Sequence, residues 1–167
     1  MTLKKTSEEI QISFRLEETA PNTFSSVLVN LPLDALNNEV FVCTSGLLDL
    51  SAPDALAGTD TTVSAAITTT TVTAVPGINS SQCIIASESS IRAAGFVDGG
   101  VGFTDMAPDG PQAGMQNIGI IATPDFMVSI VGTQNVNAKS VNGRLYGFRA
   151  RASSSVYASL VQSELLS

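Results

Sequence analysis

The sequence predicts an all-β protein, an antiparallel β-sandwich of about eight strands with a short C-terminal helix, in one domain spanning residues 1–167. Short apolar segments alternate with polar residues at a period of two, and turn-forming residues recur about every ten residues. Almost no segment has helical spacing. This pattern is typical of antiparallel sandwiches and barrels, and 167 residues with 44% apolar side chains suffice for one sizeable core.

The N-terminal third contains the clearest strand pattern. Residues 9–16 alternate apolar and polar side chains, which predicts a strand with one face in the core and the other in water. Residues 23–31 predict a second strand, and residues 32–38 predict a loop or a single helical turn. Residues 39–50 are apolar on both faces and are expected at the centre of a sheet, with Gly46 marking a bulge or bend.

The middle of the chain is rich in threonine, with eight in residues 59–75. Threonine is β-branched and favours extended structure, so two strands are expected, at residues 61–67 and 69–75. Two shorter strands are predicted to follow, at residues 82–87 and 90–96. Residues 98–114 are dense in glycine and proline and predict a long surface loop, of a kind that is usually functional or interfacial.

The C-terminal third is expected to supply the centre of the fold. Residues 125–131 and 143–152 have strand periodicity, and residues 132–142 between them are rich in polar and turn-forming residues. We expect these two strands to pair as an antiparallel hairpin with a long exposed tip. Residues 154–166 have apolar side chains at helical spacing and predict a short amphipathic helix with a serine cap.

The core is expected to form from the inward-facing positions of these strands. Side chains at alternate positions of a strand share a face, so one face of each predicted strand supplies the buried residues. The residues expected to point inward are Ile10, Ile12, Phe14, Val40, Val42, Phe126, Val128, Ile130, Tyr146 and Phe148.

The charge distribution argues against nucleic-acid binding. The formal net charge is −7, whereas neutralising phosphates requires a basic surface. Between Arg15 and Arg92 there are eight acidic residues and no lysine or arginine. Half of the eight basic residues lie in residues 139–151. They are Lys139, Arg144, Arg149 and Arg151.

No catalytic motif is apparent, and no catalytic residue, cofactor or metal ligand is assigned. The chain has no histidine, which is the commonest general base and a common metal ligand. Cys43 and Cys83 lie in apolar surroundings and are expected to be small buried side chains rather than nucleophiles. We therefore predict no enzymatic activity.

The aspartates of the predicted long loop leave alternatives open. Asp98, Asp105 and Asp109 lie in this predicted loop, and Asp98 and Asp109 are next to glycine, where aspartate commonly stabilises turns. Carboxylates could also form a hydrolytic pair or supply oxygen ligands to Ca²⁺. The turn interpretation is favoured over both.

No targeting signal is recognised in the sequence. Residues 1–14 include two lysines without a following apolar stretch, so no secretory signal is expected. No apolar run is long enough to predict a membrane span. Synthesis in the cytoplasm is the expectation.

The pattern resembles the single jelly-roll coat proteins of icosahedral bacterial and archaeal viruses. The resemblance is carried by the opening strand at residues 10–16, the threonine- and alanine-rich residues 59–75, and the closing strands at residues 126–130 and 145–148. It implies a jelly-roll-like sandwich that acts as a virion structural protein, a homo-oligomer that self-assembles with other virion proteins. The implied location is the virion.

The N-terminal region departs from one feature of that family. Many such coats carry a basic N-terminal arm that neutralises the genome, whereas only Lys4 and Lys5 are present here. The chain is therefore similar to coats whose genome is enclosed by a membrane or pumped in by a motor. Direct nucleic-acid binding is not expected, and contact with an internal membrane or a host surface is implied instead.

The charge split suggests how copies would meet. We expect the basic residues near the C-terminus, and the aspartates of the long loop, to contact neighbouring subunits. These expected contacts are Lys139, Arg144, Arg149, Arg151, Asp98, Asp105 and Asp109. The alternative is that these charges are only solvated faces. Two other functions stay open, a sandwich binding or adhesion module for a glycan or protein partner and, more distantly, an acid-pair hydrolase.

Overall fold

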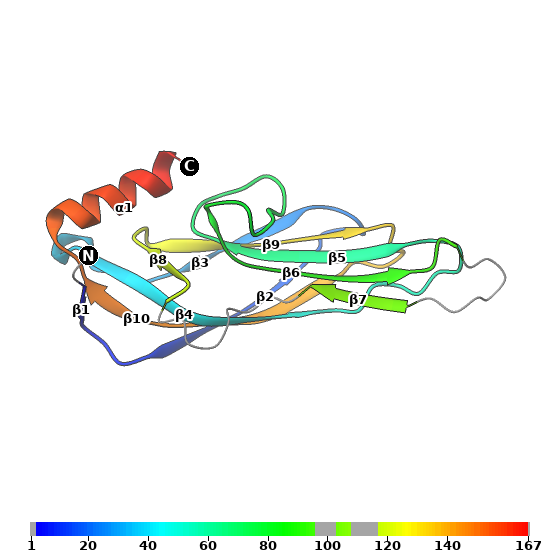
Figure 1. Ribbon diagram of the computed structural model, residues 1–167, viewed down its shortest axis with the longest axis horizontal. Helices are drawn as coiled ribbons and strands as arrows, with labels where there is room; N and C mark the ends of the chain where they lie inside the picture. Colours follow the sequence, from blue (N-terminus) through cyan, green and yellow to red (C-terminus); the bar gives the residue numbers. More distant parts are fainter. Residues whose placement is uncertain (1–2, 96–102, 108–116, 167) are drawn as a thin grey trace.

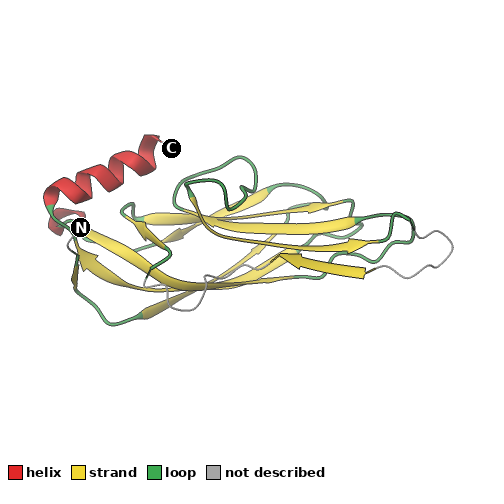
Figure 2. Ribbon diagram, in the orientation of Figure 1, coloured by secondary structure: helices red, strands yellow, loops and turns green. Residues whose placement is uncertain are grey.

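The computed structural model describes residues 3–95, 103–107 and 117–166, which form two antiparallel sheets packed face to face (Figures 1 and 2). The prediction of an all-β sandwich is confirmed. We call the sheet that contains β4 the first sheet and the one that contains β5 the second sheet. Each has five strands in the described part of the chain.

The first sheet has β10 and β4 at its centre. The strand β10 (Ser140–Arg151) pairs with β4 (Glu39–Leu50) along almost its whole length. On its other side β10 pairs with β2 (Ile10–Glu17) and, near its end, with the two-residue β1 (Lys4–Lys5). The short β8 (Gly119–Ile121) pairs with the outer side of β4.

The second sheet has β9 and β5 among its interior strands. Its order is β3 (Ser25–Asn30), β9 (Asp125–Thr133), β5 (Thr61–Thr68), β6 (Cys83–Arg92) and β7 (Phe103–Ala107). The strand β9 is buried on both faces, as its apolar residues on alternating sides predicted. The edges of this sheet are β3 and β7.

The connectivity is consistent with a jelly roll. From β2 to β5 the chain alternates between the two sheets, β6 then pairs with β5 in the same sheet, and β8, β9 and β10 alternate again. Apart from β1 and β7, which extend the two sheets, the resulting orders are β2-β10-β4-β8 and β3-β9-β5-β6, and they are consistent with the two Greek keys of a jelly roll.

The predicted central hairpin is wrong. The strands β9 and β10 lie in different sheets, and residues 134–139 carry the chain across from one sheet to the other. Each strand is central in its own sheet. The periodicity identified both strands correctly, but alternation along one strand carries no information about which strand lies beside it.

Several element boundaries also differ from the prediction. Residues 69–75 are not a strand, and residues 69–82 form a loop between β5 and β6. The two short strands predicted after it are one continuous strand, β6. Part of the predicted long loop is the strand β7, which pairs with β6, while residues 98–102 and 108–114 of that loop lie outside the described residues. The helical turn expected in residues 32–38 is present as a 3₁₀ turn, Ala35–Asn37.

A bulge in β4 lies beside Gly46 rather than at it. The register against β10 shifts between Tyr146 and Gly147, so that Thr44 is the extra residue of β4. Gly46 itself pairs regularly with Leu145. A Cβ atom on Gly46 would overlap the end of the Ile85 side chain from β6, so glycine at this position lets the two sheets approach closely.

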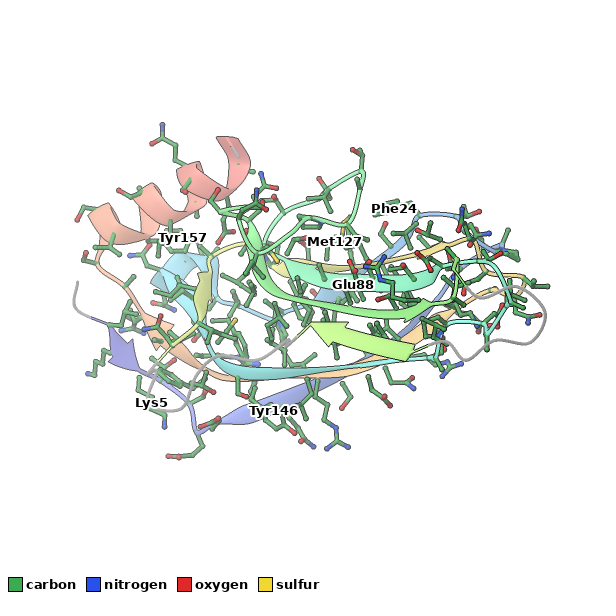
Figure 3. All side chains as sticks on the ribbon, turned by 45° about the vertical axis from the view of Figure 1, so that its right-hand side comes forward. Lys5, Phe24, Glu88, Met127, Tyr146 and Tyr157 are labelled. Carbon is green, nitrogen blue, oxygen red and sulfur yellow. The ribbon has the colours of Figure 1, made fainter. Side chains whose placement is uncertain are left out.

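The main core fills the space between the sheets. Phe41, Phe126, Ile130 and Leu145 are fully buried in it, and Ile10, Ile12 and Phe14 pack against it. The rings of Phe14 and Phe126 meet edge to face, with centroids 6.1 Å apart. The inward assignment of Tyr146 is wrong, because Leu145 and Val141 supply the inward face of β10 and Tyr146 projects from the opposite face (Figure 3).

The C-terminal helix covers a second, smaller core. The helix α1 (Ser154–Leu166) packs on the face of β4 and β10 that points away from the main core, and Ser153 caps its N-terminus. The expected core residues Val40, Val42 and Phe148 lie in this cluster, beneath the helix. Near the helix C-terminus the buried Glu164 accepts hydrogen bonds from the backbone N–H groups of Ala122 and Thr123 beside β8, and burial raises its pKa.

Candidate functional site

The two ends of the sandwich are built differently. The helix α1 and the N-terminal strand β1 lie at one end, at the left in Figure 1. At the other end the β2–β3, β4–β5 and β9–β10 connections come together. We call this the loop end. The buried polar side chains of Glu18, Asn135 and Lys139 lie here, which makes it the first candidate for a functional surface.

Glu18 ties two loops together at this end. Its side chain is buried, and both carboxylate oxygens accept backbone hydrogen bonds. One oxygen accepts from the N–H groups of Thr23 and Gly132, each at 2.9 Å, and the other accepts from the N–H of Lys139 at 2.8 Å. The β2–β3 connection is therefore fastened to both ends of the β9–β10 connection.

Asp54 does the same from the β4–β5 connection. One of its oxygens accepts from the N–H groups of Val136 and Asn137, and the other lies 2.7 Å from the ammonium group of Lys139. The Lys139 ammonium also donates to the carbonyl of Ala52. The ion pair with Lys139 and the backbone N–H of Asn137 hold the pKa of Asp54 well below its usual range.

Two further contacts complete the network. Asn135 is buried, donates through its amide group to the carbonyl of Thr62, and exchanges two hydrogen bonds with Asn22 through its own backbone. Asp60 accepts from the N–H groups of Ala94 and Ala93 at the end of β6, which lowers its pKa. All the connections that meet at the loop end are therefore cross-linked by side-chain-to-backbone hydrogen bonds.

This arrangement favours rigidity over chemistry. A carboxylate that already accepts several N–H bonds is a poor proton carrier, since removing those bonds leaves buried amides unpaired. The same bonds fix the loops in one conformation. Sequence reasoning missed Glu18, Asp54 and Asn135, because polar residues in loops look solvated until the partner loops are known.

The predicted basic cluster is not a cluster in space. Lys139 is buried at the loop end with only 7% of its side chain exposed, so it offers little surface to a neighbouring subunit. Arg144 lies in the middle of β10 and is exposed. Arg149 and Arg151 lie at the far end of β10, and being an odd number of residues from Arg144 they project from the opposite face. Arg149 is also paired with Glu39 at 3.9 Å.

The predicted loop aspartates are only partly located. Asp105 lies in β7, where its backbone pairs with Ser90. Asp98 and Asp109 lie outside the described residues. Their expected role in subunit contacts stays a prediction, as do the turn, hydrolytic and Ca²⁺ interpretations.

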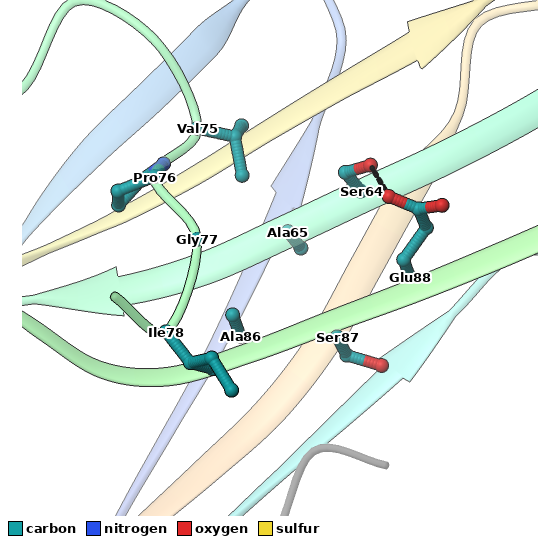
Figure 4. A pocket seen from close by; sticks show the side chains of 9 residues that line it. All are labelled: Ser64, Ala65, Val75, Pro76, Gly77, Ile78, Ala86, Ser87 and Glu88. Atoms are coloured by element: carbon teal, nitrogen blue, oxygen red, sulfur yellow. Dashed lines mark hydrogen bonds between the residues drawn. The ribbon is translucent and has the colours of Figure 1, made fainter. Parts of the chain in front are cut away.

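A shallow apolar pocket lies on the outer face of the second sheet (Figure 4). The loop that follows β5 folds back over β5 and β6, and encloses about 350 Å³ with them. Pro76, Gly77 and Ile78 form one wall, and Ser64 and Glu88 lie on the sheet with a 3.2 Å hydrogen bond between them. Ile78 is largely exposed at its rim. No Phe, Tyr or Trp is among the residues that line it.

Neither cysteine has the surroundings of a nucleophile. Cys43 is fully buried in the main core, and burial raises the pKa of its thiol far above the ordinary range. Cys83 is half-buried, and burial raises its pKa as well. Reactive thiols need the opposite shift, toward the thiolate. The interpretation of both cysteines as small apolar side chains is therefore supported.

The described residues contain neither a cluster of metal ligands nor a membrane-spanning helix. Within them, no three Cys, Asp or Glu side chains gather in a way that would hold a metal ion. None of their helices combines the length and apolar character required to cross a membrane.

Comparison with known proteins adds no relative. No family model, curated protein or solved structure matches the chain. Any functional proposal therefore depends on the fold and on the geometry of the chain itself.

Proposed function

We propose that this chain is a structural subunit of a virus shell, a coat or capsid protein that acts by self-assembly. The observation that carries the proposal is the strand order, β2-β10-β4-β8 packed on β3-β9-β5-β6, which is consistent with a jelly roll. Viral coat proteins are one of the main groups built on this fold. A fold alone supports many functions, so the remaining argument concerns how the surface suits each group.

Other jelly-roll proteins are less well matched. Cupins commonly hold a metal through histidines inside the sandwich, and this chain has no histidine. Sugar-binding sandwiches favour aromatic platforms, whereas the chain has no Trp and only two Tyr. A shell subunit requires neither a metal nor a reactive group.

The loop end suits a subunit that meets many identical neighbours. Glu18 and Asp54 fix three connections in one shape before any contact forms. A preformed surface loses little conformational entropy on association. The same interface, repeated around a closed shell, multiplies a modest contact energy.

The exposed arginines are the remaining candidates for charged contacts. Arg144 and Arg151 are exposed, and each chain carries an excess of seven negative charges for them to meet on a neighbour. Exposed ion pairs contribute only about 0–1 kcal/mol each, so they would set register while buried surface supplies most of the affinity. The acidic balance also fits a shell that does not bind nucleic acid directly.

Electron microscopy of the expressed protein tests this proposal. Lysates of cells that produce the chain, with any partner shell protein supplied, should contain closed particles of uniform diameter. Arg144→Glu together with Arg151→Glu should leave the subunit folded but reduce or misregister these particles, while Arg92→Glu, on β6 of the second sheet, is the control at a charge away from β10. Absence of particles at every concentration and salt would contradict the proposal.

The apolar pocket favours a second candidate, a binding module. Its volume of about 350 Å³ and its apolar wall fit one or two apolar side chains of a protein partner better than a sugar. Ala86→Leu would fill it from the sheet side. If a partner is captured by the wild type and lost with Ala86→Leu, while the chain stays monomeric, this candidate replaces the shell subunit.

A further inference from the structure

The edge strand β3 has no charge along it. The strand β3 is the outermost strand of the second sheet, next to β9. It lies within residues 19–33, a segment that contains no Asp, Glu, Lys or Arg. Leu28 at its middle is 51% exposed. The edge strand β2 of the first sheet differs, because Arg15 and Glu17 lie on it. Proteins usually guard an open edge with charge, proline or a bulge, and β3 has none of these within its length.

The backbone groups on the open side of β3 can be identified. Leu31 donates its N–H to the carbonyl of Pro124, the residue opposite it next to β9, at 2.6 Å. Along an antiparallel strand the hydrogen-bonding groups point alternately to the two sides. Ser25, Val27 and Val29 therefore bond to β9, whereas the N–H and C=O groups of Ser26, Leu28 and Asn30 point away from the sheet. No other described residue hydrogen-bonds to these groups.

These open groups are self-complementary. Two copies of β3 placed antiparallel, with a two-fold axis through Leu28, bring Leu28 opposite Leu28 and Ser26 opposite Asn30 of the second copy. These are the positions whose N–H and C=O groups face outward. Each such pair would exchange two hydrogen bonds, as in a regular antiparallel ladder.

The side chains agree with the same register. A two-fold axis perpendicular to the sheet keeps the outer face of both copies on one side. The two Leu28 side chains then become direct cross-strand neighbours and cover each other's exposed surface. On the inner side Val27 lies opposite Val29 of the second copy. Because this stretch is neutral, two chains of net charge −7 would meet where their repulsion is weakest.

We propose that the chain forms a two-fold symmetric dimer by antiparallel pairing of β3 with β3 of a second copy, centred on Leu28. The second sheets of the two copies then form one continuous sheet. This goes beyond the proposed function, since the dimer would exist whether or not dimers build a shell.

Charge at the edge tests the dimer. Leu28→Lys places two ammonium groups opposite each other and should abolish the dimer mass in sedimentation velocity. Leu47→Lys is the matched control, because Leu47 is 55% exposed but lies on β4 in the other sheet, away from β3. Both variants should keep the wild-type circular dichroism, and only Leu28→Lys should lose the dimer.

Cross-linking tests the register. In a Cys83→Ser background, Leu28→Cys should give a disulfide-linked dimer on mild oxidation, because opposed Cα atoms in a hydrogen-bonded pair lie about 5.5 Å apart, within disulfide range. Ser26→Cys is the control, since the two copies of residue 26 would be offset by four residues, about 13 Å along the strands. Cross-linking of Ser26→Cys instead of Leu28→Cys, or an unchanged mass for Leu28→Lys, would overturn the proposal.

The outcomes separate this dimer from the shell. If the wild type forms a dimer but no larger assembly, and Leu28→Lys is monomeric, the result supports β3 pairing and contradicts the shell. Shells that still form with Leu28→Lys, and no disulfide with Leu28→Cys, overturn β3 pairing and leave the shell intact.

Discussion

The ammonium group of Lys139 lies 2.7 Å from a carboxylate oxygen of Asp54, and only 7% and 18% of the two side chains are exposed. Residue 139 follows β9 and residue 54 follows β4, so this contact joins connections that are 85 residues apart in sequence. It removes from the surface a lysine that the sequence suggested for subunit contacts. It also adds an ion pair to the hydrogen bonds that hold the β4–β5 and β9–β10 connections together.

Removing the carboxylate should destabilise the subunit strongly. Asp54→Asn leaves the charge of the buried Lys139 ammonium without a carboxylate partner, and loss of the charge of one member of a buried pair costs up to about 3–5 kcal/mol. Asp49→Asn, at an exposed aspartate on β4, should change stability by no more than about 0.5 kcal/mol. Urea unfolding of dissociated subunits measures both. Equal stability of the two variants would mean that the ion pair is dispensable.

The same carboxylate predicts how stability depends on pH. Because the pKa of Asp54 is lower in the folded chain than its ordinary value of about 3.9, the folded state favours the ionised form. Its contribution is fully present above about pH 5 and is lost as pH falls through the folded pKa. Unfolding free energy should therefore drop steeply below about pH 4. The drop should be shallower in Asp54→Asn, a comparison that separates Asp54 from Glu164, whose pKa is shifted upward. If the curves of unfolding free energy against pH run parallel for the wild type and Asp54→Asn, the assigned role of Asp54 is contradicted.

The strands were largely predictable from sequence, and their partners were not. Residues 9–16 and 39–50 were located almost to the residue, since period-two alternation depends only on local burial. Residues 69–75 failed because threonine favours both strands and solvated loops. Pairing β9 with β10 failed because a sandwich that alternates sheets separates strands that are neighbours in sequence.

The polar network at the loop end could not be predicted from the sequence either. Glu18 and Asp54 bond to amides more than 80 residues away, and nothing in their local sequence marks them. The basic residues show the opposite case, in which residues close in sequence lie apart in space. Lys139, Arg144 and Arg149 are close in sequence, but an extended strand separates them by roughly 3.3 Å per residue and by alternating faces.

Gly147 should tolerate no side chain. A Cβ atom there would overlap the carbonyl oxygen of Val42 and lie 2.7 Å from a ring carbon of Phe41, beside the bulge in β4. Since a backbone oxygen cannot swing aside, Gly147→Ala should cost about 1–3 kcal/mol. Gly95→Ala is the control, because its Cβ would meet no described atom within 4 Å. Thermal unfolding measures the difference, and a Gly147→Ala variant as stable as Gly95→Ala would refute the bulge geometry.

Phe126 should be among the most costly core residues to remove. It is fully buried between the sheets and packs edge to face on Phe14. Phe126→Ala is expected to lower the unfolding free energy by about 3–5 kcal/mol. Leu36→Ala, at a side chain that is 95% exposed, should be nearly neutral. Denaturant titration gives both values, and a loss below about 1 kcal/mol at Phe126 would place it outside the core.

The mass of the purified protein in solution tests the central claim most directly. The chain has a mass of 17.3 kDa, so a shell would appear in multi-angle light scattering as a single narrow species many times heavier. Raising salt toward 1 M, where the screening length is about 3 Å, should weaken but not abolish it, because charges set only the register. For the chain alone, we predict a single narrow species whose mass is a large integral multiple of the subunit mass. A mass that stays at one or two subunits across all concentrations and salts, with any partner shell protein present, would contradict the shell.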